Sequence, residues 1–299
     1  MRIGFALPQF GALAGTPDQI ARFARLIEDE AGGDSLWVGD RLLAAVDPAV
    51  GYGGAATIPV QFNTSLDPFG LLAVAATVTT RVTLGTSVLN APWYPPALLA
   101  RSLTTIDVLS AGRLLLGFGI GWSPEEYEAT GIPMSQRGAR LDECLDALDA
   151  LWTTDPAEYR GRYWRVPLSR VTLKPVRKQG PPIYLAGVAP SARRRIARRA
   201  DGWLPVCRPG TRPFDPDAMI TRPLAHLRRL AEEEGRDPST LGTVLRLNPV
   251  AGATVEDCVE TLRRAGDSEV DHAFVDLHYI AGSVDHALDL ARRILDLAR

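Results

Sequence analysis

Short apolar runs alternate with longer amphipathic stretches along almost the whole chain. The short runs have the length of buried strands, whereas the long stretches repeat apolar residues at helical spacing. One long stretch places Leu141, Cys144, Leu145, Leu148 and Leu151 on a single face. The predicted strands are 3–8, 36–39, 82–88, 113–118, 183–186, 203–206, 244–247 and 273–277. The predicted helices are 16–31, 67–79, 96–109, 137–152, 191–200, 217–234, 255–265 and 284–297.

This alternation gives about eight strand–helix units, which is the count of a TIM barrel. Parallel strands need a crossover of this kind, because a short turn joins only antiparallel neighbours. We therefore predict an α/β fold, a (β/α)8 TIM barrel with insertion loops, formed by one domain over residues 1–299. A doubly wound parallel sheet is the alternative that the same alternation allows.

Two long segments interrupt the alternation. Residues 42–66 follow the second predicted strand and carry several Gly, Pro and Ala residues, and residues 153–182 precede the fifth. Loops longer than about 15 residues in a compact domain are usually functional or disordered. Because a barrel carries its site at the carboxyl ends of its strands, residues 42–66 are a candidate lid. A variable surface insertion is the alternative.

Composition narrows the class of protein. Hydrophobic residues make up 46% of the chain, and the formal net charge is -2, which gives no basic footprint for nucleic acid or an anionic membrane. No apolar run approaches the roughly 18 residues that cross a bilayer. Cys144, Cys207 and Cys258 are isolated, odd in number and without metal-ligand spacing. This pattern predicts a protein of the reducing cytoplasm, and no metal site is expected.

The basic residues are almost all arginine. Arginine supplies 31 of the 33, and Lys174 and Lys178 are the others. This usage, with abundant Ala, Gly and Pro, is typical of a GC-rich genome and favours an actinobacterial source.

Four segments carry a resemblance to a known family. They are MRIGFALPQFG at the start, RVTLGTSVLNAPWYPPALLARSLTTIDVLSAGRLLLGFGIGW from position 81, RGARLDECLDALDALW from position 137, and LKPVRKQGPPIYLAGVAPSARRRIARRADGWLP from position 173. In this order they resemble the bacterial luciferase-like oxidoreductases over nearly the whole chain. The likeness is nearest to the branch that uses the deazaflavin coenzyme F420 rather than FMN. It implies a TIM barrel, a bound coenzyme F420 and a homodimer.

Asp40 and Arg41 end the second predicted strand, where the family usually has Asp-His or Glu-His beside the flavin ring. Asp40 matches the family pattern, but Arg41 does not. An arginine cannot exchange a proton near neutral pH, although it can hold an anionic substrate or polarise a carbonyl. The alternative is that Arg41 only pairs with Asp40 or with another carboxylate.

The last predicted strand offers a replacement proton donor. Strand alternation places Phe274, Asp276 and His278 on one face, toward the barrel interior, with His278 near its top. In the seventh strand Arg246 and Asn248 share a face in the same way. These polar residues are expected to form one interior network, either catalytic or purely structural, because polar groups are costly to bury unless they are paired.

The resemblance also assigns cofactor-binding residues at two strand ends. In relatives the peptide at Ser87–Val88 is cis and lies against the back of the ring, and Asn90 is expected to contact the ring edge or the ribityl chain. Gly119, Gly121 and Trp122 line the neighbouring strand end. Relatives that oxidise sugar phosphates carry a glutamate in place of Trp122, so this tryptophan favours a more apolar substrate. Alternatively, Trp122 only caps the barrel mouth.

A phosphate site is predicted after the fifth strand. Gly187 and Val188 follow the strand, and Ser191 is expected to open the next helix, whose free N–H groups and dipole attract an anion. Relatives bind the flavin phosphate group here. Residues 193–195 are three consecutive arginines, which we interpret as mostly solvated, because a charge run on a helix is usually a solvated face.

The resemblance thus implies an oxidoreductase that transfers a hydride between coenzyme F420 and a small-molecule substrate, apolar or carbonyl-containing. Its predicted catalytic residues are Asp40, Arg41 and His278. An FMN-dependent luciferase-like monooxygenase is one alternative. A member of the same fold that has lost catalysis and only binds a ligand is another, and Arg41 is its best support.

Overall fold

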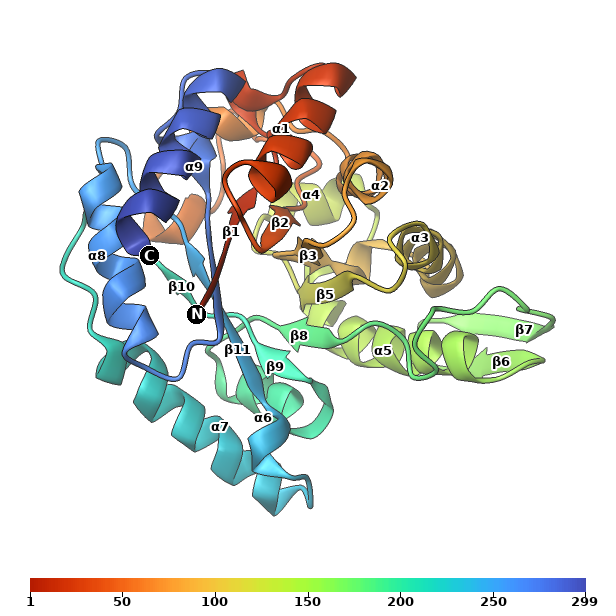
Figure 1. Ribbon diagram of the computed structural model, residues 1–299. Helices are drawn as coiled ribbons and strands as arrows, with labels where there is room; N and C mark the ends of the chain where they lie inside the picture. Colours follow the sequence, from red (N-terminus) through yellow and green to blue (C-terminus); the bar gives the residue numbers. More distant parts are fainter.

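Parallel strands close into a ring in the computed structural model, which describes residues 1–299 (Figure 1). The eight strands follow one another in the order β1 (Arg2–Ala6), β2 (Ser35–Val38), β3 (Thr83–Thr86), β5 (Leu114–Gly119), β8 (Ile183–Leu185), β9 (Gly202–Trp203), β11 (Gly242–Leu247) and β12 (His272–Val275). β12 pairs back to β1. β4 (Leu89–Asn90) and β10 (Val206–Cys207) add short extensions at the carboxyl end. The closed ring confirms the TIM barrel and excludes the doubly wound sheet, which has two open edges.

Helices surround this ring on the outside (Figure 1). They are α1 (Pro17–Asp29), α2 (Pro68–Val78), α3 (Pro96–Leu109), α4 (Pro124–Ala129), α5 (Arg137–Thr153), α6 (Pro190–Arg199), α7 (Arg222–Glu233), α8 (Val255–Gly266) and α9 (Val284–Ala298). Most start at the predicted signals. Asp67 caps α2 by accepting from the Gly70 N–H at 2.8 Å, and Pro68 occupies the first helical position. No helix has both the length and the apolar character needed to cross a membrane.

Two apolar regions hold the barrel together. The larger one, of 63 buried residues, fills the space between the strands and the helices and includes Cys144, Cys207 and Cys258. The smaller one plugs the barrel interior, where the rings of Trp37 and Phe274 stack with centroids 4.4 Å apart. Gly85 makes room for this plug, because a Cβ atom there would come within 2.3 Å of the Trp37 ring.

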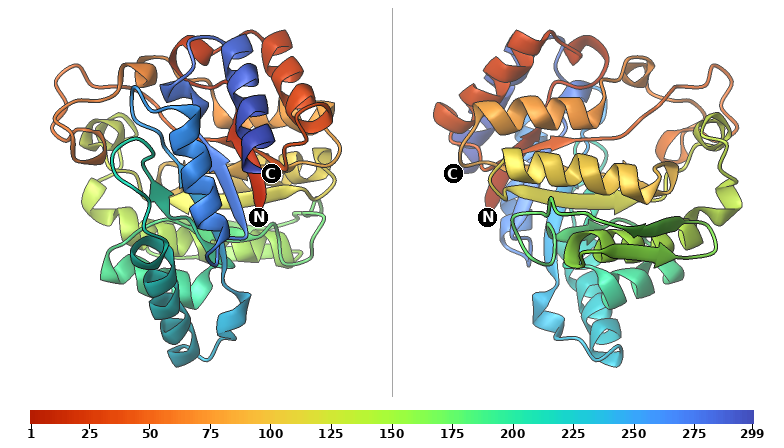
Figure 2. Two further views of the ribbon diagram at one scale, coloured as in Figure 1. Left: turned by 60° about the vertical axis from the view of Figure 1, so that its left-hand side comes forward. Right: turned by 90° about the vertical axis from the view of Figure 1, so that its right-hand side faces the viewer.

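The two long segments differ in character. Residues 153–182 contain an antiparallel hairpin of β6 (Ala157–Arg160) and β7 (Arg165–Ser169), which projects from the barrel beside α5 (Figure 1). This segment leads into β8 at its amino end and is therefore remote from the carboxyl face. Residues 42–66, hereafter the lid segment, form short helical turns at Tyr52–Gly54 and Val60–Asn63. Figure 2 shows the lid segment looping out at one end of the barrel, next to α4.

Candidate active site

A cavity of about 280 Å3 opens at the carboxyl ends of the barrel strands. It is lined by Phe10, Gly39, Asp40, Arg41, Tyr52, Phe62, Ser87, Val88, Asn90, Gly119, Ile120, Gly121, Trp122, Ala186, Gly187 and Arg246. The structure therefore brings together nine of the predicted site residues, which follow the ends of four separate strands. Three others, Val188, Ser191 and His278, do not line it.

Asp40 is the only carboxyl group in the cavity wall. Its side chain is buried and accepts two hydrogen bonds, from the Asn90 N–H at 2.8 Å and from the Tyr94 hydroxyl at 2.9 Å. The Asn90 amide in turn donates to the Asp40 carbonyl at 3.1 Å. Burial raises the pKa of Asp40 to about 7 and outweighs the two hydrogen bonds, which lower the pKa. Asp40 thus orients Asn90, and its raised pKa lies near neutral pH.

Arg41 is held between two aromatic rings. Its guanidinium carbon lies 4.5 Å from the Trp122 ring centroid and 5.1 Å from that of Phe62, within the range of cation–π attraction. Its Nη1 lies 3.2 Å from Glu126 Oε2, and its Nη2 donates to the Leu43 carbonyl at 2.9 Å. We call Arg41 and Glu126 the lid pair. Burial lowers the pKa of Arg41 despite the attraction of Glu126. The predicted alternative of a carboxylate partner is therefore realised, while Arg41 still lines the cavity.

Glu126 was missed by sequence reasoning. Its Oε1 accepts from the Leu42 N–H at 2.8 Å, and the neighbouring Glu125 accepts from the Ala49 N–H at 2.7 Å, so the first turn of α4 anchors the lid segment. The only local signal was the run from Ser123 to Glu126, which is typical of a helix start with acidic residues in its first turn. That signal explains a helix cap and gives no hint of a partner 85 residues earlier.

Half-buried Arg246 and buried Asp276 form a second ion pair, which we call the strand pair. Arg246 Nε lies 2.5 Å from Asp276 Oδ2, and Nη1 donates to the Ser87 carbonyl at 2.7 Å. The Ser87–Val88 peptide is cis, as the resemblance implied. The predicted interior network thus exists in part, because Asn248 bonds instead to the Tyr52 hydroxyl at 2.9 Å.

His278 does not occupy the predicted position. β12 ends at Val275, and Leu277–Tyr279 forms a 3-10 turn, which breaks the strand alternation that assigned His278 to the interior face. The imidazole packs instead against Phe10, with ring centroids 5.0 Å apart, and neither of its nitrogens has a hydrogen-bond partner. Burial lowers its pKa to about 4. The structure therefore gives no support to His278 as a proton donor in the cavity.

The predicted phosphate site also needs two corrections. α6 begins at Pro190 rather than at Ser191, with Ala189 as the capping residue, and both Ser191 and Val188 are exposed. Gly187 has φ of 137°, and a Cβ there would lie 2.6 Å from that of Ala192, so only glycine fits. The free N–H groups of the first turn of α6 follow this lining residue.

The arginine run on α6 is only partly solvated. Arg195 is buried and pairs with both carboxylate oxygens of Asp142, at 2.6 and 2.9 Å, whereas Arg194 is exposed. The interpretation of all three arginines as a solvated face was therefore wrong for Arg195. Its role is to join α6 to α5.

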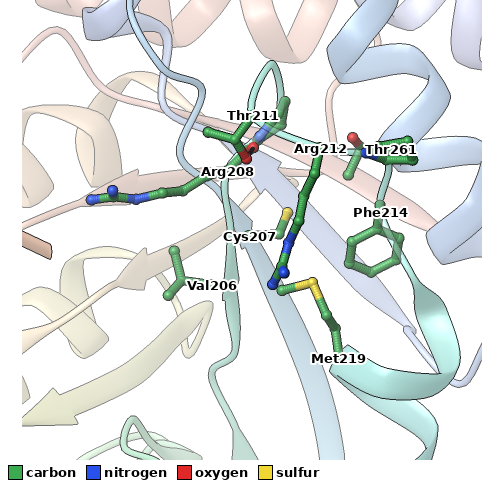
Figure 3. Close-up of a pocket in the computed structure, with 10 residues that line it drawn as sticks. Val206, Cys207, Arg208, Thr211, Arg212, Phe214, Met219 and Thr261 are labelled. Atoms are coloured by element: carbon green, nitrogen blue, oxygen red, sulfur yellow. Dashed lines mark hydrogen bonds between the residues drawn. The ribbon is translucent and has the colours of Figure 1, made fainter. Parts of the chain in front are cut away.

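A further hollow, of about 230 Å3, lies beyond β10 (Figure 3). Arg212 points into it beside Met219, whereas Arg208 points away from the other labelled side chains. The hollow shares no lining residue with the active-site cavity. It therefore belongs to a different part of the surface.

The cavity fits the ring system of a flavin-type cofactor. Gly119, Gly121 and Gly187 leave part of its wall without side chains, so a flat ring can approach the backbone closely. Asn90 and Arg246 supply donors, and the first turn of α6 supplies N–H groups for an anionic end. No cluster of residues suited to a metal ion is present.

Comparisons with known proteins give the family and the fold of the chain. A sequence profile of the luciferase-like monooxygenase family matches residues 1–294. Rv0940c, an uncharacterized protein of Mycobacterium tuberculosis, is 36% identical over 205 residues, which cover 69% of this chain and 66% of that protein. The phthiodiolone/phenolphthiodiolone dimycocerosates ketoreductase of Mycobacterium bovis is 30% identical over 254 residues, covering 82% of this chain and 65% of the ketoreductase. The chain thus spans about two thirds of the length of these relatives.

A solved structure has a similar fold. An F420-dependent secondary alcohol dehydrogenase in complex with an F420-acetone adduct is similar with a TM-score of 0.76 and 16% identity. The match covers 100% of this chain and 99% of the dehydrogenase. At this identity the likeness shows a shared fold.

Proposed function

The chain belongs to the luciferase-like monooxygenase family, and from this premise we propose that it transfers a hydride between coenzyme F420 and a small neutral alcohol or carbonyl compound. The cavity at the barrel mouth carries the proposal. The side chains of Asp40, Arg41, Asn90 and Trp122 line the same cavity, and glycines form part of its wall. The resemblance to the deazaflavin branch favours F420 over FMN.

The protein's own contribution begins with binding. Asn90 and Arg246 are positioned to contact the ring system, and the first turn of α6 after Gly187 is positioned for the phosphate. The coenzyme, when bound, supplies a ring carbon that donates or accepts a hydride. The lid segment excludes water, since its Tyr52 and Phe62 side chains form one wall of the cavity.

Asp40 is the group that we assign to proton transfer. It replaces His278 in this role, because it lines the cavity and its pKa of about 7 suits exchange near neutral pH. In the direction of reduction, the carboxylic acid form gives its proton to the substrate oxygen as the carbon receives the hydride. In the direction of oxidation, the carboxylate takes the hydroxyl proton.

Arg41 favours a neutral substrate over an anionic one. Its charge is compensated by Glu126 at 3.2 Å, so an anionic substrate would have to compete with a carboxylate already in place. A carbonyl oxygen, in contrast, can accept a hydrogen bond from the guanidinium without displacing Glu126. The aromatic rings of Phe62 and Trp122 suit an apolar body on the same molecule.

Titration of the purified protein with coenzyme F420 and with FMN tests the proposal. We expect coenzyme F420 to bind at least tenfold more tightly, a difference of about 1.4 kcal/mol. Tight FMN binding with oxygen consumption by the reduced flavin would instead establish the second candidate, an FMN-dependent monooxygenase, which the family's description favours. Binding of neither cofactor would refute both.

A further inference from the structure

A second cavity, of about 350 Å3, adjoins the lid segment at the barrel mouth. Tyr52 lines both this cavity and the active-site cavity, and it therefore forms part of the partition between them. Much of the remaining wall is apolar, with Pro59 and Val60 from the lid segment and Pro249 and Val250 from the loop after β11. Its place at the carboxyl ends of two barrel strands is where barrel enzymes bind their substrates.

Two buried polar groups in this second cavity lack hydrogen-bond partners. Asn248 is 4% exposed, and its Nδ2 donates to the Tyr52 hydroxyl at 2.9 Å, but its Oδ1 has no partner. The Tyr279 hydroxyl also has no hydrogen-bond partner. Burial and the neighbouring Tyr52 raise the pKa of Tyr279, so the hydroxyl keeps its proton and can donate it in a hydrogen bond. Since an unsatisfied buried polar atom is unfavourable, a ligand that completes these bonds gains affinity.

A cation lies at the rim. Arg208 is exposed, forms no ion pair, and places its guanidinium carbon 5.7 Å from the Tyr52 ring centroid. Figure 3 shows that this side chain points away from Phe214 and Met219. Arg208 thus lines the second cavity as well as the hollow beyond β10.

We propose that the second cavity is a subsite for the remote part of the substrate, an apolar chain or ring that carries a hydroxyl or a primary amide. Asn248 Oδ1 needs a donor, whereas Tyr279 and Arg208 offer donors, and only a group that both donates and accepts satisfies all three. A carboxylate would leave Asn248 Oδ1 unpaired. This assignment rests on the proposed function, because the active-site cavity then holds the reacting end of the same molecule.

Binding of hexanamide and hexanoate to the protein without coenzyme, measured by saturation-transfer NMR, tests the subsite. We expect hexanamide to bind at least threefold more tightly than hexanoate. Ala251→Trp, at an exposed lining position, should weaken hexanamide binding at least fivefold, and Ala55→Trp on the lid side should do the same. Ala218→Trp, also exposed but outside the cavity, should have no effect.

Equal hexanamide affinity in the wild type and both folded cavity variants would overturn the subsite, as would a preference for hexanoate. Coenzyme titration of the same variants separates this result from the proposed function. Coenzyme binding with hexanamide affinity unchanged by Ala251→Trp refutes the subsite alone. Loss of hexanamide binding in that variant, in a protein that binds no coenzyme, supports the subsite and refutes the proposed function.

Discussion

Two arginine–carboxylate pairs face the same cavity, but their surroundings differ. The strand pair joins Arg246 on β11 to Asp276 directly after β12 at 2.5 Å, and a second bond from Arg246 reaches the Ser87 carbonyl. The lid pair joins Arg41 at the end of β2 to Glu126 on the short helix α4 at 3.2 Å. Each member of the lid pair keeps a buried atom without a hydrogen bond, Arg41 Nε and Glu126 Oε2.

The pKa shifts of the two arginines also show that the strand pair is better compensated than the lid pair. For Arg246, burial lowers the pKa, but Asp276, Tyr52 and Tyr279 together outweigh it and the pKa is raised. For Arg41, burial outweighs Glu126 and the pKa is lowered. A well-compensated pair on rigid strands therefore acts as a scaffold. An incompletely compensated pair on a lid and a short helix keeps hydrogen-bonding capacity for a ligand. Facing the cavity does not by itself make a charged residue catalytic.

Removing one member of the strand pair should have the largest effect. Asp276→Ala leaves the Arg246 guanidinium in place without its counter-charge, and breaking a buried pair in this way costs about 3–5 kcal/mol. Urea denaturation should show this loss in the free energy of unfolding. Asp285→Ala, which removes an exposed partner of Arg22, is the matched control and should change little. A loss below about 1 kcal/mol in Asp276→Ala would contradict the scaffold role.

His278 lies beside the strand pair and should make the fold sensitive to acid. Its pKa is about 4 in the fold and about 6.5 when unfolded, so the unfolded chain binds the extra proton between these values. The contribution is present above pH 6.5 and is lost as the pH falls toward 4, by up to roughly 3 kcal/mol. His278→Gln should flatten this part of the stability profile.

The comparison must be made between the two proteins, because other groups titrate in the same range. His272, whose pKa burial lowers to about 3, acts in the same direction. Asp40, with its raised pKa, acts in the opposite one. Both are shared by the wild type and His278→Gln, so they cancel in the difference. Identical profiles would show that His278 does not stay neutral in the fold.

Changes in the lid pair should alter substrate binding rather than the free energy of unfolding. Arg41→Ala removes the donor to the carbonyl oxygen and should raise KM for a neutral ketone about tenfold, or about 1.4 kcal/mol, with the coenzyme Kd unchanged within about twofold. Arg41→Lys should not restore KM, because an ammonium lacks the flat guanidinium that stacks between Phe62 and Trp122. Lost coenzyme affinity in Arg41→Ala would place Arg41 in the cofactor site instead.

Glu126→Gln should give the smallest change. Glu126 contributes to the raised pKa of Asp40, so removing its charge should lower that pKa by less than one unit. The pH–rate profile should show a group near pH 7 that moves to lower pH in Glu126→Gln, stays in Glu125→Gln and disappears in Asp40→Asn. A group that persists in Asp40→Asn would refute Asp40 as the proton carrier.

The sequence by itself determined the order of strands and helices and most of the cavity wall. Each barrel strand is a short apolar run, and the residues that follow β2, β3 and β5 must meet because parallel strands end at the same face. Asp40, Asn90 and Trp122 follow these strand ends, and the family resemblance singled them out among the residues there. Alternation of side chains between two faces, in contrast, predicts a residue's direction only as far as the strand continues. Alternation past Val275 predicted an inward His278, but the chain turns there.

Only the tertiary structure decided which charges are paired. Nothing near Arg41 in the sequence identifies Glu126, because their contact depends on how the lid segment returns across α4. The pKa of Asp40, the orphaned Asn248 Oδ1 and the burial of Arg195 likewise depend on neighbours from distant segments. Hydrophobic periodicity is a local property and can be read along the chain. Burial and charge compensation are set by long-range packing, so they exist only once the barrel has closed.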